Sequence, residues 1–140
     1  MSTAFDEIKV GDEYKFTHKG FTRTDFVKYA GGGGDFNPIH HDESFAKMSG
    51  NESVFGMGML TAGMLGRVLT DWFGSTSVKT YGIRFKSRLW PGDNVEFKGT
   101  VNKVYETDGV KHVDIDLTAI SQKDEVLIQA YGTCRPWSPQ

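Results

Sequence analysis

The sequence lacks the features of secreted, membrane-spanning and nucleic-acid-binding proteins. It holds one cysteine, Cys134, which excludes an intrachain disulfide and a four-cysteine metal site. The formal net charge is -2, so the basic excess that binds nucleic-acid phosphates or an anionic membrane is missing. Residues 1–7 carry acids where a signal peptide needs basic residues followed by an apolar run. We therefore expect a cytoplasmic protein whose partners include neither nucleic acid nor a membrane.

Repeats, low-complexity segments and Pro- or Ser-rich linkers are also lacking, apart from four consecutive glycines at Gly31 to Gly34. The chain has 140 residues, 38% of them hydrophobic, which suffices for one core but is too short for two. We expect residues 1–140 to form a single domain.

One long stretch, residues 57–73, has the apolar period of a helix. Apolar side chains recur at every fourth position, at Leu60, Met64, Val68 and Trp72. The stretch is apolar nearly all round, yet it is too short and too charged near its end for a membrane span, so we expect a helix buried inside the protein. Glycines weaken a helix, and those at 58, 63 and 66 predict that another backbone packs very close.

A shorter helical pattern precedes the four glycines. Thr22 or Thr24 can act as its N-cap, an acid follows in the first turn, and apolar residues lie at positions 26, 27 and 30. We expect a short helix that the glycine run ends.

Beyond Gly74 the apolar period changes to two, which is typical of strands. Alternation runs from Tyr81 to Leu89, resumes at 95–101, 113–117 and 126–131, and is interrupted by turn-forming residues at 91–94 and 108–109. Residues 78–134 are therefore predicted to form a sequential antiparallel sheet that buries the long helix by curling around it, which is an α+β fold.

The densest chemical pattern is a carboxylate, Asp35, and an imidazole, His40, around a proline turn. Pro38 biases Asn37 away from the helical region, and the Asn37 side chain favours a turn through its own hydrogen bonds. A turn lets Asp35 and His40 converge, and such a pair can move protons because imidazole changes charge near neutral pH. Spacing alone does not separate this acid–base pair from a helix-ending loop with a half-buried histidine.

Two other interpretations of this segment have less support. A glycine-rich phosphate loop would be followed by Gly-Lys-Ser/Thr, which is not found here. A metal site could use His40 and His41, but adjacent side chains point apart and no other ligand cluster is evident. We expect neither a metal nor a cofactor.

The segment from Tyr29 to Ala46 resembles the hydratase signature of the MaoC-like (R)-specific enoyl-CoA hydratases. That signature runs from an aromatic residue through small residues to Gly-Asp-x-Asn-Pro-Ile-His, with a small residue six positions on. The resemblance continues through residues 55–61, which correspond to the start of the family's central helix, and through residues 84–93, which correspond to its next strand and turn. It covers most of the chain.

The resemblance implies the hotdog fold, a curled antiparallel sheet wrapped around one long central helix. It also implies that Asp35 and His40 hold a water that adds to the β-carbon of a 2-enoyl thioester while a proton reaches the α-carbon on the same face. Asn37 would hold the loop and orient the pair. A close second is a 3-hydroxyacyl-[acyl-carrier-protein] dehydratase subunit. Further alternatives are a hotdog thioesterase and a non-catalytic acyl-binding subunit, although the Asp-x-Asn-Pro-Ile-His arrangement with both members of the pair is the hydratase pattern.

The family places a backbone N–H at the start of the central helix against the thioester oxygen, which here is that of Gly58. A helix N-terminus suits an oxyanion because its N–H groups are unpaired and its dipole end is positive. The other meaning of Gly58 is close packing of the helix on the sheet. The chain departs from the family at Met57, where the family usually has His, so Met57 would replace a polar contact and widen or dry the pocket.

Three cations, Arg84, Lys86 and Arg88, share one face of the predicted strand and could meet the phosphates of coenzyme A or an acidic carrier protein. They could equally form a solvated face. We expect an acyl-CoA or acyl-carrier-protein thioester as substrate. The partner would be a second copy in a homodimer, or another hotdog subunit in a heterodimer, since one curled sheet leaves an edge that a partner can extend.

Overall fold

The computed structural model describes residues 5–137. In chain order the elements are β1 (Glu13–His18), α1 (Arg23–Gly33), the 3-10 turn η1 (Pro38–His40), α2 (Glu43–Met48), α3 (Gly58–Phe73), β2 (Val78–Phe85), β3 (Val95–Thr107), β4 (Val110–Ser121) and β5 (Val126–Cys134). The predicted long helix, short helix and strands are all present. β1, η1 and α2 were not predicted.

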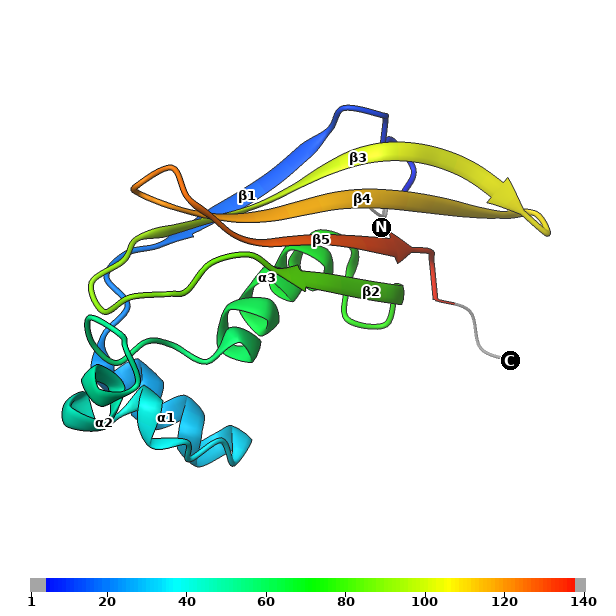
Figure 1. The fold of residues 1–140 in the computed structure, drawn as a ribbon. Coiled ribbons are helices and arrows are strands. Elements are labelled where there is room, and N and C mark those ends of the chain that lie inside the picture. Colours follow the sequence, from blue (N-terminus) through cyan, green and yellow to red (C-terminus); the bar gives the residue numbers. More distant parts are fainter. Residues whose placement is uncertain (1–4, 138–140) are drawn as a thin grey trace.

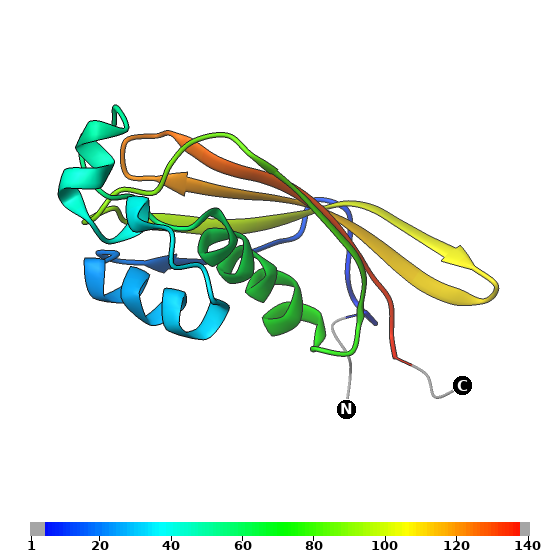
Figure 2. The same cartoon turned by 60° about the horizontal axis from the view of Figure 1, so that its bottom comes forward.

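The strands form one antiparallel sheet in the order β1-β3-β4-β5-β2, and α3 lies against one face of it (Figure 1). α1 and α2 lie beyond the start of α3, and the β3–β4 hairpin projects at the opposite end (Figure 2). The expectation of sequential strands is wrong for β2, which pairs with β5 rather than β3. Residues 86–94 are too long for a tight hairpin and carry the chain across to β3 instead.

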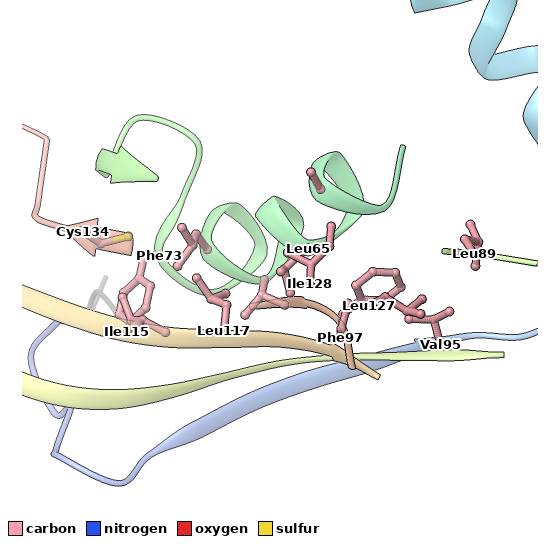
Figure 3. Close-up of a cluster of buried hydrophobic side chains, with 14 of the residues drawn as sticks. Leu65, Phe73, Leu89, Val95, Phe97, Ile115, Leu117, Leu127, Ile128 and Cys134 are labelled. Atoms are coloured by element: carbon pink, nitrogen blue, oxygen red, sulfur yellow. The ribbon is translucent and has the colours of Figure 1, made fainter. Parts of the chain in front are cut away.

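The core lies between α3 and the sheet. Leu65 and Val68 of α3 are fully buried, and Phe97, Ile115 and Leu117 face them from the central strands (Figure 3). Burying one such side chain stabilises the fold by about 1.5–3 kcal/mol. In the described part of the chain, no helix has the length and apolar character that crossing a bilayer requires.

The prediction that the glycines of α3 meet a neighbouring backbone is wrong. A Cβ at Gly58 would meet the ring of Phe85, and one at Gly66 would touch the ring of Tyr81. A Cβ at Gly63 would meet no described atom within 4 Å outside its own helix turn. Each contact is with a side chain.

Two glycines in the sheet, rather than those in α3, allow the helix to approach the strands closely. A Cβ at Gly99 would lie 2.7 Å from Val68 of α3, and a Cβ at Gly132 would lie 2.6 Å from Leu69. The absence of side chains at these two strand positions lets α3 sit close to β3 and β5.

α1 begins at the predicted N-cap, Thr22. The Thr22 hydroxyl accepts from the backbone N–H of Asp25, and the Asp25 carboxylate accepts from the backbone N–H of Thr22. The helix continues through three of the four glycines and ends only at Gly34, whose φ of 77° is in the left-handed region that favours glycine. The glycine run thus ends the helix, as expected, and does so at its last member.

β2 ends earlier than its alternating pattern predicts. Its last residue is Phe85, and the N–H groups of Lys86 and Ser87 both donate to the carbonyl of Leu127, at 2.8 and 3.2 Å. Because two successive N–H groups share one acceptor, the regular hydrogen bonding between β2 and β5 is interrupted here, as it is at a β-bulge. Arg84, Lys86 and Arg88 consequently do not share one strand face.

Candidate active site

The loop after α1 is folded by its own short polar side chains. The Asp35 carboxylate accepts from the N–H of Asn37 at 3.3 Å, and the Asn37 side chain accepts from the N–H of Ile39 at 3.1 Å. Pro38 then opens the 3-10 turn η1, which ends at His40. Two successive side-chain turns thus reverse the chain between Asp35 and His40.

The reversal brings the carboxylate and the imidazole together. Nε2 of His40 lies 3.5 Å from Oδ2 of Asp35, with the His40 side chain 10% exposed and the Asp35 side chain 47% exposed. The other ring nitrogen, Nδ1, lies 2.7 Å from the carbonyl oxygen of Phe55. Because a carbonyl only accepts, Nδ1 carries a proton, and Nε2 is the nitrogen that faces Asp35.

Phe55 holds the imidazole in a second way, through its ring. The rings of His40 and Phe55 meet edge to face with centroids 5.2 Å apart, and Phe55 meets Trp90 similarly at 5.9 Å. The Arg88 guanidinium lies over the Phe55 ring at 4.7 Å. Sequence reasoning missed Phe55 and Trp90, because no local pattern distinguishes a phenylalanine that orients a histidine from one that fills a core.

A cavity of about 700 Å³ opens beside this pair. Asp35 borders it directly, while the His40 ring adjoins Asp35 without lining the cavity itself. Further walls come from the start of α3, with Gly58 and Thr61, and from residues 85–90, which begin at the end of β2. One cavity therefore adjoins the Asp35–His40 pair, the N-terminus of α3, and Lys86 and Arg88.

The start of α3 leaves its backbone donors without a side-chain cap. Met57 is the N-cap residue and makes no side-chain capping bond. Gly58, the first helical residue, borders the cavity. Uncapped N–H groups and the positive end of the helix dipole thus meet the space next to Asp35.

The remaining predicted site residues divide into two groups. Lys86 and Arg88 border the cavity, whereas Arg84, Asn37 and Met57 do not. Met57 is 2% exposed and packs within the hydrophobic core, so the geometry gives no support to a direct substrate contact by its side chain. Between residues 5 and 137, no group of three or more His, Cys, Asp or Glu side chains gathers where it could hold a metal ion.

Comparison with known proteins gives one family and related enzymes. The family described as "MaoC like domain" matches residues 6–123. The chain is 31% identical over 88 residues to a mitochondrial 3-hydroxyacyl-[acyl-carrier-protein] dehydratase of Arabidopsis thaliana, covering 63% of this chain and 52% of that protein. It is 33% identical over 82 residues to the 3-oxo-4,17-pregnadiene-20-carboxyl-CoA hydratase beta subunit of Mycobacterium tuberculosis, covering 58% of this chain and 62% of the relative. The chain thus matches between half and two thirds of each relative.

Solved structures agree on the fold. The (R)-hydratase from A. caviae involved in PHA biosynthesis superposes with a TM-score of 0.83 at 19% identity, over 92% of this chain and 97% of that one. The curled antiparallel sheet around one central helix is the hotdog fold, as the sequence resemblance implied.

Proposed function

Because the chain belongs to the MaoC-like domain family, we propose that it adds water to a trans-2-enoyl-CoA to give the (R)-3-hydroxyacyl-CoA, or catalyses the reverse dehydration. The observation that carries this proposal is the approach of Nε2 of His40 to Oδ2 of Asp35 at 3.5 Å, beside a cavity whose wall includes Asp35 and a helix start. A proton-transfer pair and an anion-stabilising group are what this chemistry requires.

The tautomer of His40 fits a water held between the two side chains. With the proton on Nδ1, a neutral His40 presents a lone pair at Nε2, opposite an acceptor oxygen of Asp35. One water molecule can donate a hydrogen to each, which leaves its oxygen lone pairs free to attack. A carbon–oxygen bond then forms at the β-carbon, the water proton passes to the pair, and the pair returns a proton to the α-carbon on the same face.

The backbone N–H of Gly58 would stabilise the negative charge that develops on the thioester oxygen. Its support is the uncapped start of α3 at the cavity wall. Asn37 would hold the loop geometry through its bond to the N–H of Ile39. Lys86 and Arg88, at the cavity edge, would meet phosphate groups of the substrate's carrier, and Arg84 would add exposed positive charge nearby.

A second candidate is dehydration of a 3-hydroxyacyl group on an acyl carrier protein. The name of the Arabidopsis relative supports it, and the same acid–base pair would serve both carriers. Parallel assays with the coenzyme A and carrier-protein thioesters of one acyl chain distinguish the two, because the preferred carrier gives the higher kcat/KM.

We also propose that the chain works with a second hotdog subunit. Among the described strands, β2 lies at an edge and pairs with β5 alone. Large apolar side chains on these two strands, Phe85 and Tyr131, are 53% and 63% exposed. An unpaired edge beside exposed aromatics favours extension by another chain. The Mycobacterium relative is named as a subunit, which supports a heteromer as readily as a homodimer.

The first experiment follows the absorbance of crotonyl-CoA with purified protein while a thiol reagent reports free coenzyme A. Loss of enoyl absorbance without thiol release is the expected result. Loss with thiol release would identify a thioesterase and overturn the proposal. No change with either the coenzyme A or the carrier-protein thioester would leave a non-catalytic acyl-binding subunit as the conclusion.

The pair is tested by Asp35→Asn and His40→Gln, each of which should lower kcat by about 10²–10⁴, because general acid–base catalysis contributes that much. The kcat of the double variant should be little lower than that of the less active single variant, since the two groups act as a unit. His41→Gln is a matched control, because His41 is an exposed neighbour whose ring nitrogen contacts the carbonyl of Phe36 instead. Turnover near wild type in either pair variant would remove the pair from the mechanism.

A further inference from the structure

One buried side chain on the cavity wall has a hydrogen-bonding group that the protein leaves unused. Thr61 is 3% exposed and borders the cavity. Its hydroxyl has no hydrogen-bond partner among the described residues. Among the described residues, every fully enclosed side-chain oxygen has a hydrogen-bond partner. Because the Thr61 hydroxyl oxygen has none, it must belong to the small accessible part of this side chain.

Thr61 differs in this respect from every other buried polar residue that the structure describes. The others are His40, Ser77, Asp93, His112 and Ser121. Each has a partner: for example, the Ser77 hydroxyl donates to the carbonyl of Gly74 at 2.6 Å, and the Asp93 carboxylate accepts from the N–H of Trp90 at 2.9 Å. Because the Thr61 hydroxyl has no partner among the described residues and Thr61 borders the cavity, this hydroxyl is available to a bound ligand.

The position of Thr61 in α3 defines what that ligand atom is. Residues three apart lie on one helix face, and helical side chains lean toward the N-terminus. Thr61 follows Gly58 by three positions, so its side chain leans back toward the first turn, where Gly58 borders the same cavity. Two donors, one from the backbone and one from a side chain, converge on the same region.

We propose that the Thr61 hydroxyl donates a hydrogen bond to the thioester carbonyl oxygen, beside the N–H of Gly58. This hydrogen bond strengthens as that oxygen gains negative charge. This assignment rests on the proposed hydration. It makes Thr61 a catalytic residue in addition to the acid–base pair. A hydroxyl can rotate to follow the oxygen as it moves, which the fixed N–H cannot do.

The test compares Thr61→Val, which keeps the shape and removes the hydroxyl, with Thr61→Ser, which keeps the hydroxyl. Thr61→Val should lower kcat on crotonyl-CoA by about 10²-fold, the lower end for loss of one oxyanion donor, with little change in KM. Thr61→Ser should recover most of the activity. The melting temperature of Thr61→Val should equal or exceed that of the wild type, because no bond within the protein is lost.

Thr70→Val is the matched control on the same helix. The Thr70 hydroxyl donates to the carbonyl of Arg67 at 3.4 Å and does not border this cavity, so its loss should leave kcat unchanged. Thr61→Val turnover within about twofold of wild type, a loss confined to KM, or a loss matched by a lower melting temperature would each overturn the role of Thr61 alone. A wild-type protein inactive on enoyl thioesters would overturn the proposed hydration as well.

Discussion

α1 and α3 begin in opposite ways. At α1, Thr22 and Asp25 satisfy each other's backbone N–H groups in a reciprocal capping box. At α3, the N-cap residue is Met57, whose side chain makes no capping bond. Capping stabilises a helix start by about 1 kcal/mol, so α3 forgoes stability that α1 obtains.

The two shorter helical segments, η1 and α2, have a side-chain cap as α1 does. Asp42 accepts from the N–H of Phe45 at the start of α2, and Asn37 accepts from the N–H of Ile39 at the start of η1, both at 3.1 Å. Among the four helical segments between residues 5 and 137, α3 is thus the one without a side-chain cap, and its start borders the cavity. The proposed role of the Gly58 N–H as a donor to the thioester oxygen would account for this difference.

The largest effect that tests this contrast is expected from Gly58→Pro. Proline removes the backbone N–H and is tolerated in the first turn of a helix. If this N–H stabilises the thioester oxygen, kcat should fall by about 10²–10³ with crotonyl-CoA while circular dichroism shows a folded protein.

The control for Gly58→Pro has to account for Phe85. A Cβ at Gly58 would lie 2.6 Å from a ring atom of Phe85, so Gly58→Ala keeps the N–H but displaces this ring. The double variant Gly58→Ala/Phe85→Ala restores the space, and it should be much more active than Gly58→Pro/Phe85→Ala. Equal activity of the two double variants would mean that packing, not the N–H, matters at Gly58.

Much of the fold was predictable because it is encoded locally. The cap at Thr22, the apolar repeat of α3 and the Asp108–Gly109 turn each lie within a few neighbouring residues, and both turn residues have the expected positive φ, 53° and 75°. The position of β2 was not predictable in this way. It depends on a crossing by residues 86–94, whose alternating pattern continues past the end of the strand.

The candidate site divides along the same line. The turn that joins Asp35 to His40 follows from Asn37 and Pro38, and the resemblance to a known signature gave the pair its chemical role. Phe55 and Thr61 could not be found from the sequence. Their proposed roles rest on a carbonyl of Phe55 that meets a ring nitrogen 15 residues away in sequence and on a hydroxyl of Thr61 that has no hydrogen-bond partner among the described residues, and both depend on the folded chain.

A smaller effect, confined to stability, is expected at the other helix start. Thr22→Ala removes the side-chain acceptor for the N–H of Asp25 and should lower the free energy of unfolding in urea by about 0.5–2 kcal/mol, with kcat unchanged. Thr24→Ala is the matched control, since Thr24 lies inside the helix and does not cap it. If the two alanine variants are equally stable, the Thr22 bond contributes nothing measurable and the contrast with α3 loses its energetic basis.

The smallest expected effect is a dependence of the free energy of unfolding on pH, which arises from Asp25 at the capped start of α1. The backbone N–H of Thr22 is the main cause that lowers the pKa of Asp25, opposed by partial burial and assisted by the Thr22 hydroxyl and by positive charge at His18 and Lys28. A carboxylate whose folded pKa is depressed stabilises the fold fully above its unfolded pKa, and this stabilisation is lost as the pH falls through the folded pKa.

Asp25→Asn keeps an acceptor for the N–H but removes the charge. It should therefore be less stable than the wild type at pH 7 by about 0.3–1 kcal/mol, the usual range for a charge at a helix start, and the difference should shrink below about pH 4. Urea unfolding of both proteins from pH 7 to pH 3 measures it. A difference that stays constant or grows on acidification would show that the Asp25 charge does not stabilise α1.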